Sequence, residues 1–235
     1  MRRAPVAICA LVATAAGALV LSGDPAPTDS AAADAGRLSL TIRPLRVRSG
    51  DEIATGFAVG GNRIVTVAHV LDGGAVVNGR RARVLRVDRR DDLALLAVSG
   101  ATALATSAGG ERLAGSRGEQ LAGSRALAES RGVATESAAG GAPVRVLRLR
   151  SGRTSSLAVH VRRAIVAHVH APGAARTVTR PALELAAHVA AGDSGAPVVS
   201  GSGALAGVVF ATSRTRERTA YAVDASALAR LLARD

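Results

Sequence analysis

The chain has 235 residues, which is enough for one large domain or two small ones. Hydrophobic residues make up 48% of it and charged residues 20%, so a real core is expected and global disorder is excluded. The formal net charge of +12 comes from arginine alone, but the arginines are dispersed and aromatic residues are only 1%, so base stacking has no support and no nucleic-acid partner is expected.

The N-terminus resembles an export signal. Met1-Arg2-Arg3 precedes an apolar run from Ala4 to Leu21, the pattern of a charged n-region and an h-region. The run is rich in Ala, Gly and Thr, which favours cleavage, although its length also permits a short membrane anchor. We therefore assign residues 1–23 to a signal peptide or anchor and residues 24–36 to a linker, and expect a secreted or cell-envelope protein. Cys9 lies in the apolar run, so the folded part has no cysteine.

Short strand-like segments begin after the linker and are separated by turns containing Gly or Asn. In the first unit, residues 37–100, they are Leu38–Ile42, Ala54–Val59, Arg63–Val67, Ala75–Asn78, Arg83–Val87 and Leu93–Val98. Short strands at this spacing are typical of an antiparallel barrel or sandwich. The fold class is therefore predicted to be all-β.

Residues 101–141 break this pattern. Leu-Ala-Gly-Ser-Arg occurs at residues 113–117 and again at 121–125, within a stretch rich in Ala, Gly, Ser, Arg and Glu. We interpret the stretch as a flexible or partly helical connector between two β units.

A second β unit occupies residues 142–235. Its predicted strands are Val144–Leu149, Leu157–Val161, Ala164–His170, Arg176–Thr179, Ala182–Ala187, Pro197–Val199, Leu205–Phe210 and Thr219–Val223. Asp224 is a good N-cap residue and strong helix formers follow it, so one terminal helix is expected.

A serine between two glycines is the main candidate for a reactive group. Gly192-Asp193-Ser194-Gly195 suits a nucleophile, because glycines permit tight backbone angles and close approach of a substrate. The same tetrapeptide is also good turn chemistry. A base and an orienting acid elsewhere in the chain would decide between the two interpretations.

Both partners are present in the first unit. His69 follows one predicted strand and Asp92 precedes another, with Asp91 as the rival acid. The chain order is His69, Asp92, Ser194, which differs from the orders found in subtilisins and in the α/β-hydrolases.

Three motifs resemble those of the chymotrypsin/trypsin-like serine peptidases, in particular compact bacterial members. They are Thr66-Val67-Ala68-His69, Asp92-Leu93-Ala94-Leu95-Leu96 and Gly192-Asp193-Ser194-Gly195-Ala196-Pro197. Leu205–Phe210 and Ala220–Val223 resemble the two strands that wall the specificity pocket of that family. The likeness covers residues 38 to 235, interrupted by the connector.

The resemblance implies two antiparallel six-stranded β-barrels with the active site between them, and endopeptidase activity without a metal or other cofactor. Ser194 would be the nucleophile, His69 the general base and Asp92 its orienting acid. The N–H groups of Gly192 and Ser194 would form the oxyanion hole. We expect a monomer that acts on protein or peptide substrates, with membrane attachment through the N-terminal segment if that segment is retained.

Some positions depart from the family pattern. Ala196 replaces the usual second glycine after the serine, and no Ile-Val-Gly-Gly type terminus is present to insert against Asp193. Asp193 is therefore expected to pair with an arginine, which the sequence does not identify.

By register with the family, His188 lies at the pocket floor, and Phe210, Thr212 and Thr219 line the walls. No carboxylate is among these residues, which argues against a preference for Arg or Lys and favours an acidic or small polar side chain.

Two other interpretations remain open. A catalytically quiet protease-fold protein that binds partners in the cell envelope would carry the same motifs. His168 and His170 share one face of a predicted strand, with His160 nearby, a pattern that begins some zinc sites but more often is a solvent-facing surface.

Overall fold

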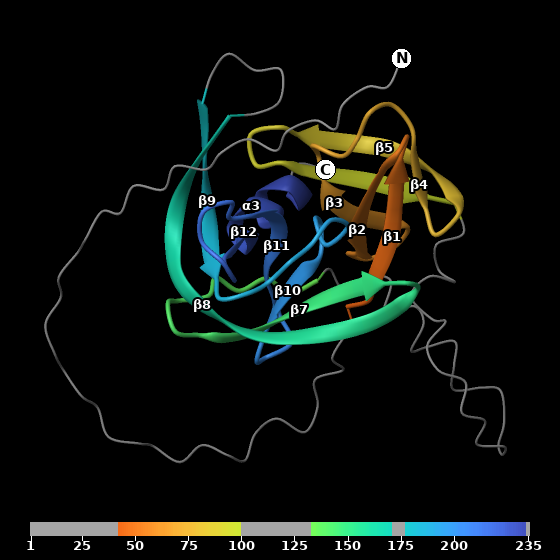
Figure 1. The fold of residues 1–235 in the computed structure, drawn as a ribbon. Helices are drawn as coiled ribbons and strands as arrows, with labels where there is room; N and C mark the ends of the chain where they lie inside the picture. Colours follow the sequence, from red (N-terminus) through yellow and green to blue (C-terminus); the bar gives the residue numbers. More distant parts are fainter. Residues whose placement is uncertain (1–41, 100–132, 171–176, 234–235) are drawn as a thin grey trace, which may run out of the picture.

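A computed structural model of the chain describes residues 42–99, 133–170 and 177–233. The strands form two closed antiparallel barrels of six strands each, and one helix follows the last strand (Figure 1). The predicted fold class is confirmed. The N-terminal segment and most of the predicted connector lie outside the described residues.

The first barrel has the strand order β1-β2-β3-β6-β5-β4. Its strands are β1 Pro44–Ser49, β2 Glu52–Ala58, β3 Arg63–Val67, β4 Ala75–Val77, β5 Arg80–Asp88 and β6 Leu93–Val98. β1 is the one strand of this barrel that the sequence did not suggest. Leu45 and Val47 point into the core, whereas arginines occupy the exposed positions between and beyond them, so the apolar pattern is short.

The second barrel has the order β10-β11-β12-β9-β8-β7. Its strands are β7 Pro143–Arg150, β8 Arg153–His170, β9 Thr177–Leu185, β10 Pro197–Ser200, β11 Leu205–Thr212 and β12 Ala220–Asp224. β8 is a long strand that curves around this barrel in Figure 1 and pairs along its length with β7 and β9.

Two pairs of predicted strands are each one continuous strand. The segments predicted on either side of residues 162 and 163 are both part of β8, and a register shift between Val161 and Arg163 interrupts the apolar alternation there. The segments predicted on either side of Pro181 are both part of β9, whose pairing with β12 begins only after the proline, at Ala182.

The helix α3, Ala225–Leu232, joins the two barrels. The Asp224 side chain accepts a hydrogen bond from the backbone N–H of Ser226 at 2.8 Å and so caps the helix. The helix packs against β11 and β12 of the second barrel and β6 of the first. The Arg86 side chain of β5 also donates to the carbonyl of Leu231 at 2.6 Å.

One apolar core extends across both barrels. It combines the interior of the first barrel with Phe210, Tyr221 and Val223 of the second and with Leu228 of α3. A further apolar cluster fills the second barrel. The barrels therefore pack against each other through a buried seam. No helix within the described ranges has the length and apolar character needed to cross a membrane.

Candidate active site

His69 and Asp92 come together because their strands are neighbours. β3 and β6 pair antiparallel, with Val67 opposite Leu93. The residues just after β3 therefore lie beside the residue just before β6. The Asp92 backbone carbonyl accepts from Ala68 N–H at 3.0 Å, and its carboxylate accepts from His69 N–H at 2.8 Å.

The imidazole of His69 is bound to the same carboxylate. Its Nδ1 lies 2.7 Å from Asp92 Oδ2, and the two side chains are 26% and 11% exposed. An ionised carboxylate only accepts hydrogen bonds, so Nδ1 carries the proton and Nε2 of a neutral ring is left as an acceptor. Burial lowers the pKa of His69, but the hydrogen bond and negative charge of Asp92 outweigh it, and the pKa lies above its ordinary value of 6.5.

Asp92 adopts a left-handed backbone conformation, with φ of 58°. This conformation is uncommon outside glycine, although aspartate tolerates it better than most residues. The rival acid, Asp91, faces elsewhere: its Oδ2 is 2.9 Å from Arg230 of α3. The structure therefore brings Asp92, and not Asp91, to the imidazole.

The loop that carries Ser194 is attached to the first barrel. Thr55 of β2 donates its N–H to the Ser194 carbonyl at 2.7 Å and its hydroxyl to the Gly192 carbonyl at 2.7 Å. The Thr66 hydroxyl, three residues before His69, donates to the Thr55 carbonyl at 2.8 Å. The serine loop and the strand leading to the histidine are thus connected through one threonine.

Asp193 is held by the arginine that the sequence left unidentified. Arg150, at the end of β7, contacts it with two nitrogens, at 2.5 Å from Nη2 and 3.4 Å from Nε. The Asp193 side chain is only 1% exposed and also accepts from the N–H of Ala190 at 2.9 Å. The hydrogen bond to Asp193 raises the pKa of Arg150, so the cation is permanent.

Backbone hydrogen bonds divide the donors of this loop into two groups. The N–H groups of Asp193 and Gly195 bond to carbonyls of the protein. Those of Gly192 and Ser194 have no acceptor among the described residues. These two donors are the ones that the sequence resemblance assigns to an oxyanion hole.

A family model described as a trypsin-like peptidase domain matches residues 54–208, which include all three motifs. The chain belongs to the trypsin-like peptidase family. No curated protein sequence matches it significantly.

Solved structures of bacterial trypsin-like proteases share its fold. The Rv3671c protease of M. tuberculosis in its active form is 24% identical over 83% of this chain and 80% of that one, with a TM-score of 0.62. The inactive form of Rv3671c protease is 26% identical over 81% and 87% of the two chains, with a TM-score of 0.59. The MamO protease domain of Magnetospirillum magneticum is 18% identical over 83% and 97%, with a TM-score of 0.58.

The glycine after the serine in this trypsin-like peptidase has no room for a side chain. Gly195 has φ of 85°, and a Cβ there would lie 1.8 Å from the Thr55 carbonyl oxygen. Ala196, the departure from the family pattern, is fully buried in the apolar cluster of the second barrel. The alanine is thus packed in the core and does not crowd the loop.

Replacing Gly195 with alanine is expected to destabilise the protein by more than about 3 kcal/mol, since backbone of the first barrel would have to move. Gly201→Ala is the matched control, because a Cβ at Gly201 meets nothing within 4 Å, and its effect is expected to be within about 0.5 kcal/mol. Urea unfolding of both variants measures the difference. Equal midpoints would show that the Thr55 contact is not rigid.

Arg150→Met is expected to lower the turnover of peptide substrates on the order of 10- to 100-fold. The change leaves Asp193 buried with a single backbone donor, and the loop that bears Gly192 and Ser194 loses its anchor. Arg153→Met, at the position paired with Arg150 across the β7–β8 turn, removes an equal charge from an exposed site. The same turnover in both variants would contradict the anchoring role.

The residues predicted to form the specificity pocket occupy different environments. His188 and Thr212 are exposed, whereas Phe210 and Thr219 are buried. The Thr212 hydroxyl donates to the carbonyl of Thr219 at 3.2 Å, within the connection between β11 and β12.

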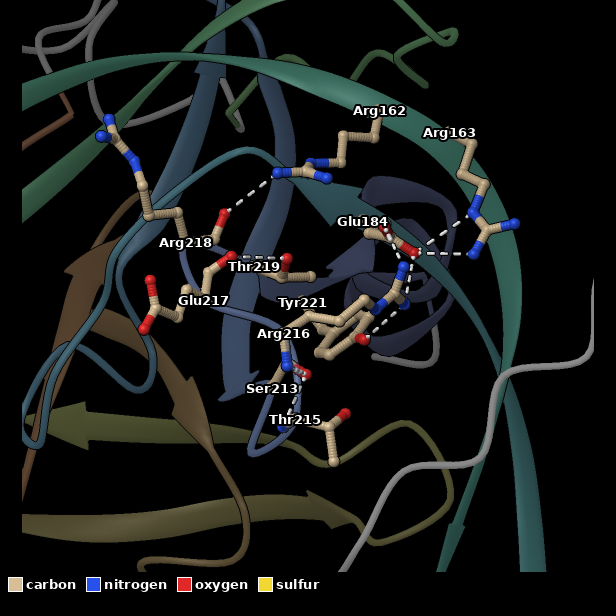
Figure 2. Close-up of polar contacts among 10 residues, drawn as sticks. All are labelled: Arg162, Arg163, Glu184, Ser213, Thr215, Arg216, Glu217, Arg218, Thr219 and Tyr221. Carbon is tan, nitrogen blue, oxygen red and sulfur yellow. Dashed lines mark hydrogen bonds and ion pairs between the residues drawn. The ribbon is translucent and has the colours of Figure 1, made fainter.

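A buried carboxylate anchors this connection. Figure 2 shows Glu184 of β9 between the guanidinium groups of Arg163 and Arg216. Glu184 is 2% exposed, and its contacts with these arginines are 3.0 to 3.1 Å long. Arg216 also donates to the Tyr221 hydroxyl at 3.2 Å, so residues 213–219 are held against the second barrel.

No group of three or more metal-ligating side chains occurs within the described residues. His160 is exposed and His168 is half-buried on β8. Sequence reasoning missed Thr55, Arg150 and Glu184, because their partners lie far away in the chain and their residue types are common at such positions.

Proposed function

We propose that this trypsin-like peptidase is an exported serine endopeptidase that hydrolyses peptide bonds through an acyl-enzyme. Ser194 Oγ attacks the scissile carbonyl, His69 Nε2 takes its proton and returns it to the leaving amine, and Asp92 holds the imidazole in that tautomer. A water that gives its proton to the same nitrogen then attacks the ester, and that proton returns to Ser194 Oγ as the acid product leaves. The N–H groups of Gly192 and Ser194 stabilise the oxyanion.

The observation that carries this proposal is the 2.7 Å contact between His69 Nδ1 and Asp92 Oδ2, on the barrel to which Thr55 fastens the serine loop. Among the described residues, no hydrogen bond joins the Ser194 hydroxyl to His69. Catalytic hydrogen bonds often tighten only when substrate is bound. The proposal therefore needs a chemical test of the serine itself.

Labelling with a fluorophosphonate probe tests it. The purified protein is incubated with the probe, digested and analysed by mass spectrometry, and the modification is expected on Ser194 alone. A folded protein that takes up no label, or takes it up equally after heat denaturation, would instead indicate the catalytically quiet protease-fold binder.

Export is proposed from the N-terminal sequence. The substrates would then be proteins or peptides outside the cytoplasmic membrane, and no metal or organic cofactor takes part. Mass spectrometry of the mature N-terminus, in culture medium and in membranes, distinguishes a cleaved signal peptide from a retained anchor.

A further inference from the structure

A buried arginine from the second barrel reaches the Asp92 carboxylate. Arg180 lies on β9, opposite Ala167 of β8, at the seam between the barrels. Its side chain is 2% exposed, and its Nη1 is 3.4 Å from Asp92 Oδ2, the oxygen that also contacts His69. Its guanidinium carbon lies 5.2 Å from the centroid of the Phe210 ring.

Arg180 is poorly explained as a stabilising residue. Its Nε has no hydrogen-bond partner among the described groups, and its Nη1 has only the 3.4 Å ion pair with Asp92. A buried cation with unsatisfied donors is costly, and buried ion pairs are often replaced by apolar side chains without loss of stability. The Phe210 ring offers a cation–π contact but leaves those donors unbonded.

We infer that Arg180 is a positioning residue of the proposed triad, which directs the Asp92 carboxylate at the imidazole of His69. The inference rests on the proposed function for its catalytic meaning. The Asp92 carboxylate then has three contacts that fix its position. They are the backbone N–H of His69, the imidazole of His69, and the guanidinium of Arg180 from the other barrel.

The positive charge of Arg180 is expected to lower the pH at which the His69–Asp92 pair takes up a proton. When the His69–Asp92 pair takes up a proton, its net charge changes from −1 to zero. A fixed positive charge beside the pair favours the unprotonated state, whichever of the two residues receives the proton. Arg180 therefore extends the range in which His69 is a free base toward lower pH.

Few charged groups act on the pKa of His69 within the described part of the chain. Asp92 raises the pKa of His69, Glu52 raises it more weakly, and Arg180 lowers it. Around Arg180 itself, burial lowers its pKa, while Asp92, Asp91 and Asp88 raise it. An arginine stays charged under these conditions, so the group acts as a permanent cation.

The test uses Arg180→Met and Arg180→Gln, which remove the charge at similar side-chain length, and Arg180→Lys, which keeps it. Arg81→Met, on the exposed side of β5, is the control for lost net charge. Thermal melting establishes that each variant is folded. If Arg180→Met is not folded, Arg180→Gln is used in its place.

Two readouts are followed against pH. The first is the titration of the His69 ring by NMR in the Ser194→Ala background, which requires no activity; His69→Gln assigns the signal. The second is the rate of fluorophosphonate labelling with Ser194 present.

Both neutral variants are expected to move the His69 titration to higher pH and to slow labelling on its acidic limb on the order of tenfold relative to the plateau. The lysine and Arg81 variants are expected to follow the wild type. Titrations of Arg180→Met and Arg180→Gln that overlay the wild type, or move to lower pH, would overturn the inference. Absence of labelling in the wild type would overturn the protease proposal instead, while the NMR titration would still decide the role of Arg180.

Discussion

Ser194→Ala is expected to lower the turnover of a cleaved peptide about a million-fold, by analogy with serine-protease triads. The change removes the only atom that forms the acyl-enzyme, while the N–H donors of Gly192 and Ser194 remain. The variant is therefore expected to retain a rate above that of uncatalysed peptide hydrolysis in water. Single-turnover rates are measured with enzyme in excess over peptide. Mass spectrometry of the products makes the slow rate of the variant measurable.

The matched control for this variant is Ser156→Ala, on the exposed face of β8. Its turnover is expected to equal that of the wild type. Because the hydroxyl of Ser194 has no hydrogen-bond partner among the described residues, the alanine variant should also melt within about 0.5 kcal/mol of the wild type. Retention of more than about 1% of the turnover would contradict a serine nucleophile at this position.

Asp92→Asn is expected to reduce turnover about 10⁴-fold with little change of geometry. The asparagine amide would donate where the carboxylate accepts, so the ring would adopt the other tautomer, with Nδ1 as the acceptor toward residue 92 and the proton on Nε2 toward the serine. The base would then lack a free lone pair for the serine proton. Steady-state kinetics on the alkaline plateau of the wild-type pH profile, where the imidazole is neutral, measures this effect.

Asp91→Asn separates the two adjacent carboxylates. Asp91 contacts Arg230 of α3 and not His69, so its variant should lose some stability and keep its turnover within a few-fold. A larger loss of turnover in Asp91→Asn than in Asp92→Asn would reverse the assignment of the acid. Thermal melting of both variants separates a folding defect from a chemical one.

The sequence was most informative where a local pattern determines the structure. Alternating apolar residues marked most strands, but the pairing of β3 with β6 belongs to the non-sequential strand order of the barrel, which that alternation does not determine. The places of His69 and Asp92 at the ends of these strands could be read in advance, because both are adjacent in the chain to strongly apolar segments. β1 was missed because arginines interrupt its short apolar pattern.

Long-range polar partners could not be read in the same way. Arg150, Arg180 and Arg216 are chemically like the many other arginines of the chain. Each acquires its role from the strand register and barrel packing that place it beside Asp193, Asp92 or Glu184. A single sequence contains no signal that separates a buried arginine of this kind from one on the surface.

The helix α3 bears on when, during folding, the two barrels become joined. Arg230 of α3 contacts Asp91, beside the orienting acid, and the carbonyl of Leu231 receives Arg86 of the first barrel. The paired residues are 139 and 145 positions apart in the chain, so neither contact can form before the second β unit has been synthesised. In a nascent chain the first barrel would therefore lack both contacts with α3 until that unit is complete, which makes the joining of the two halves a late step of folding.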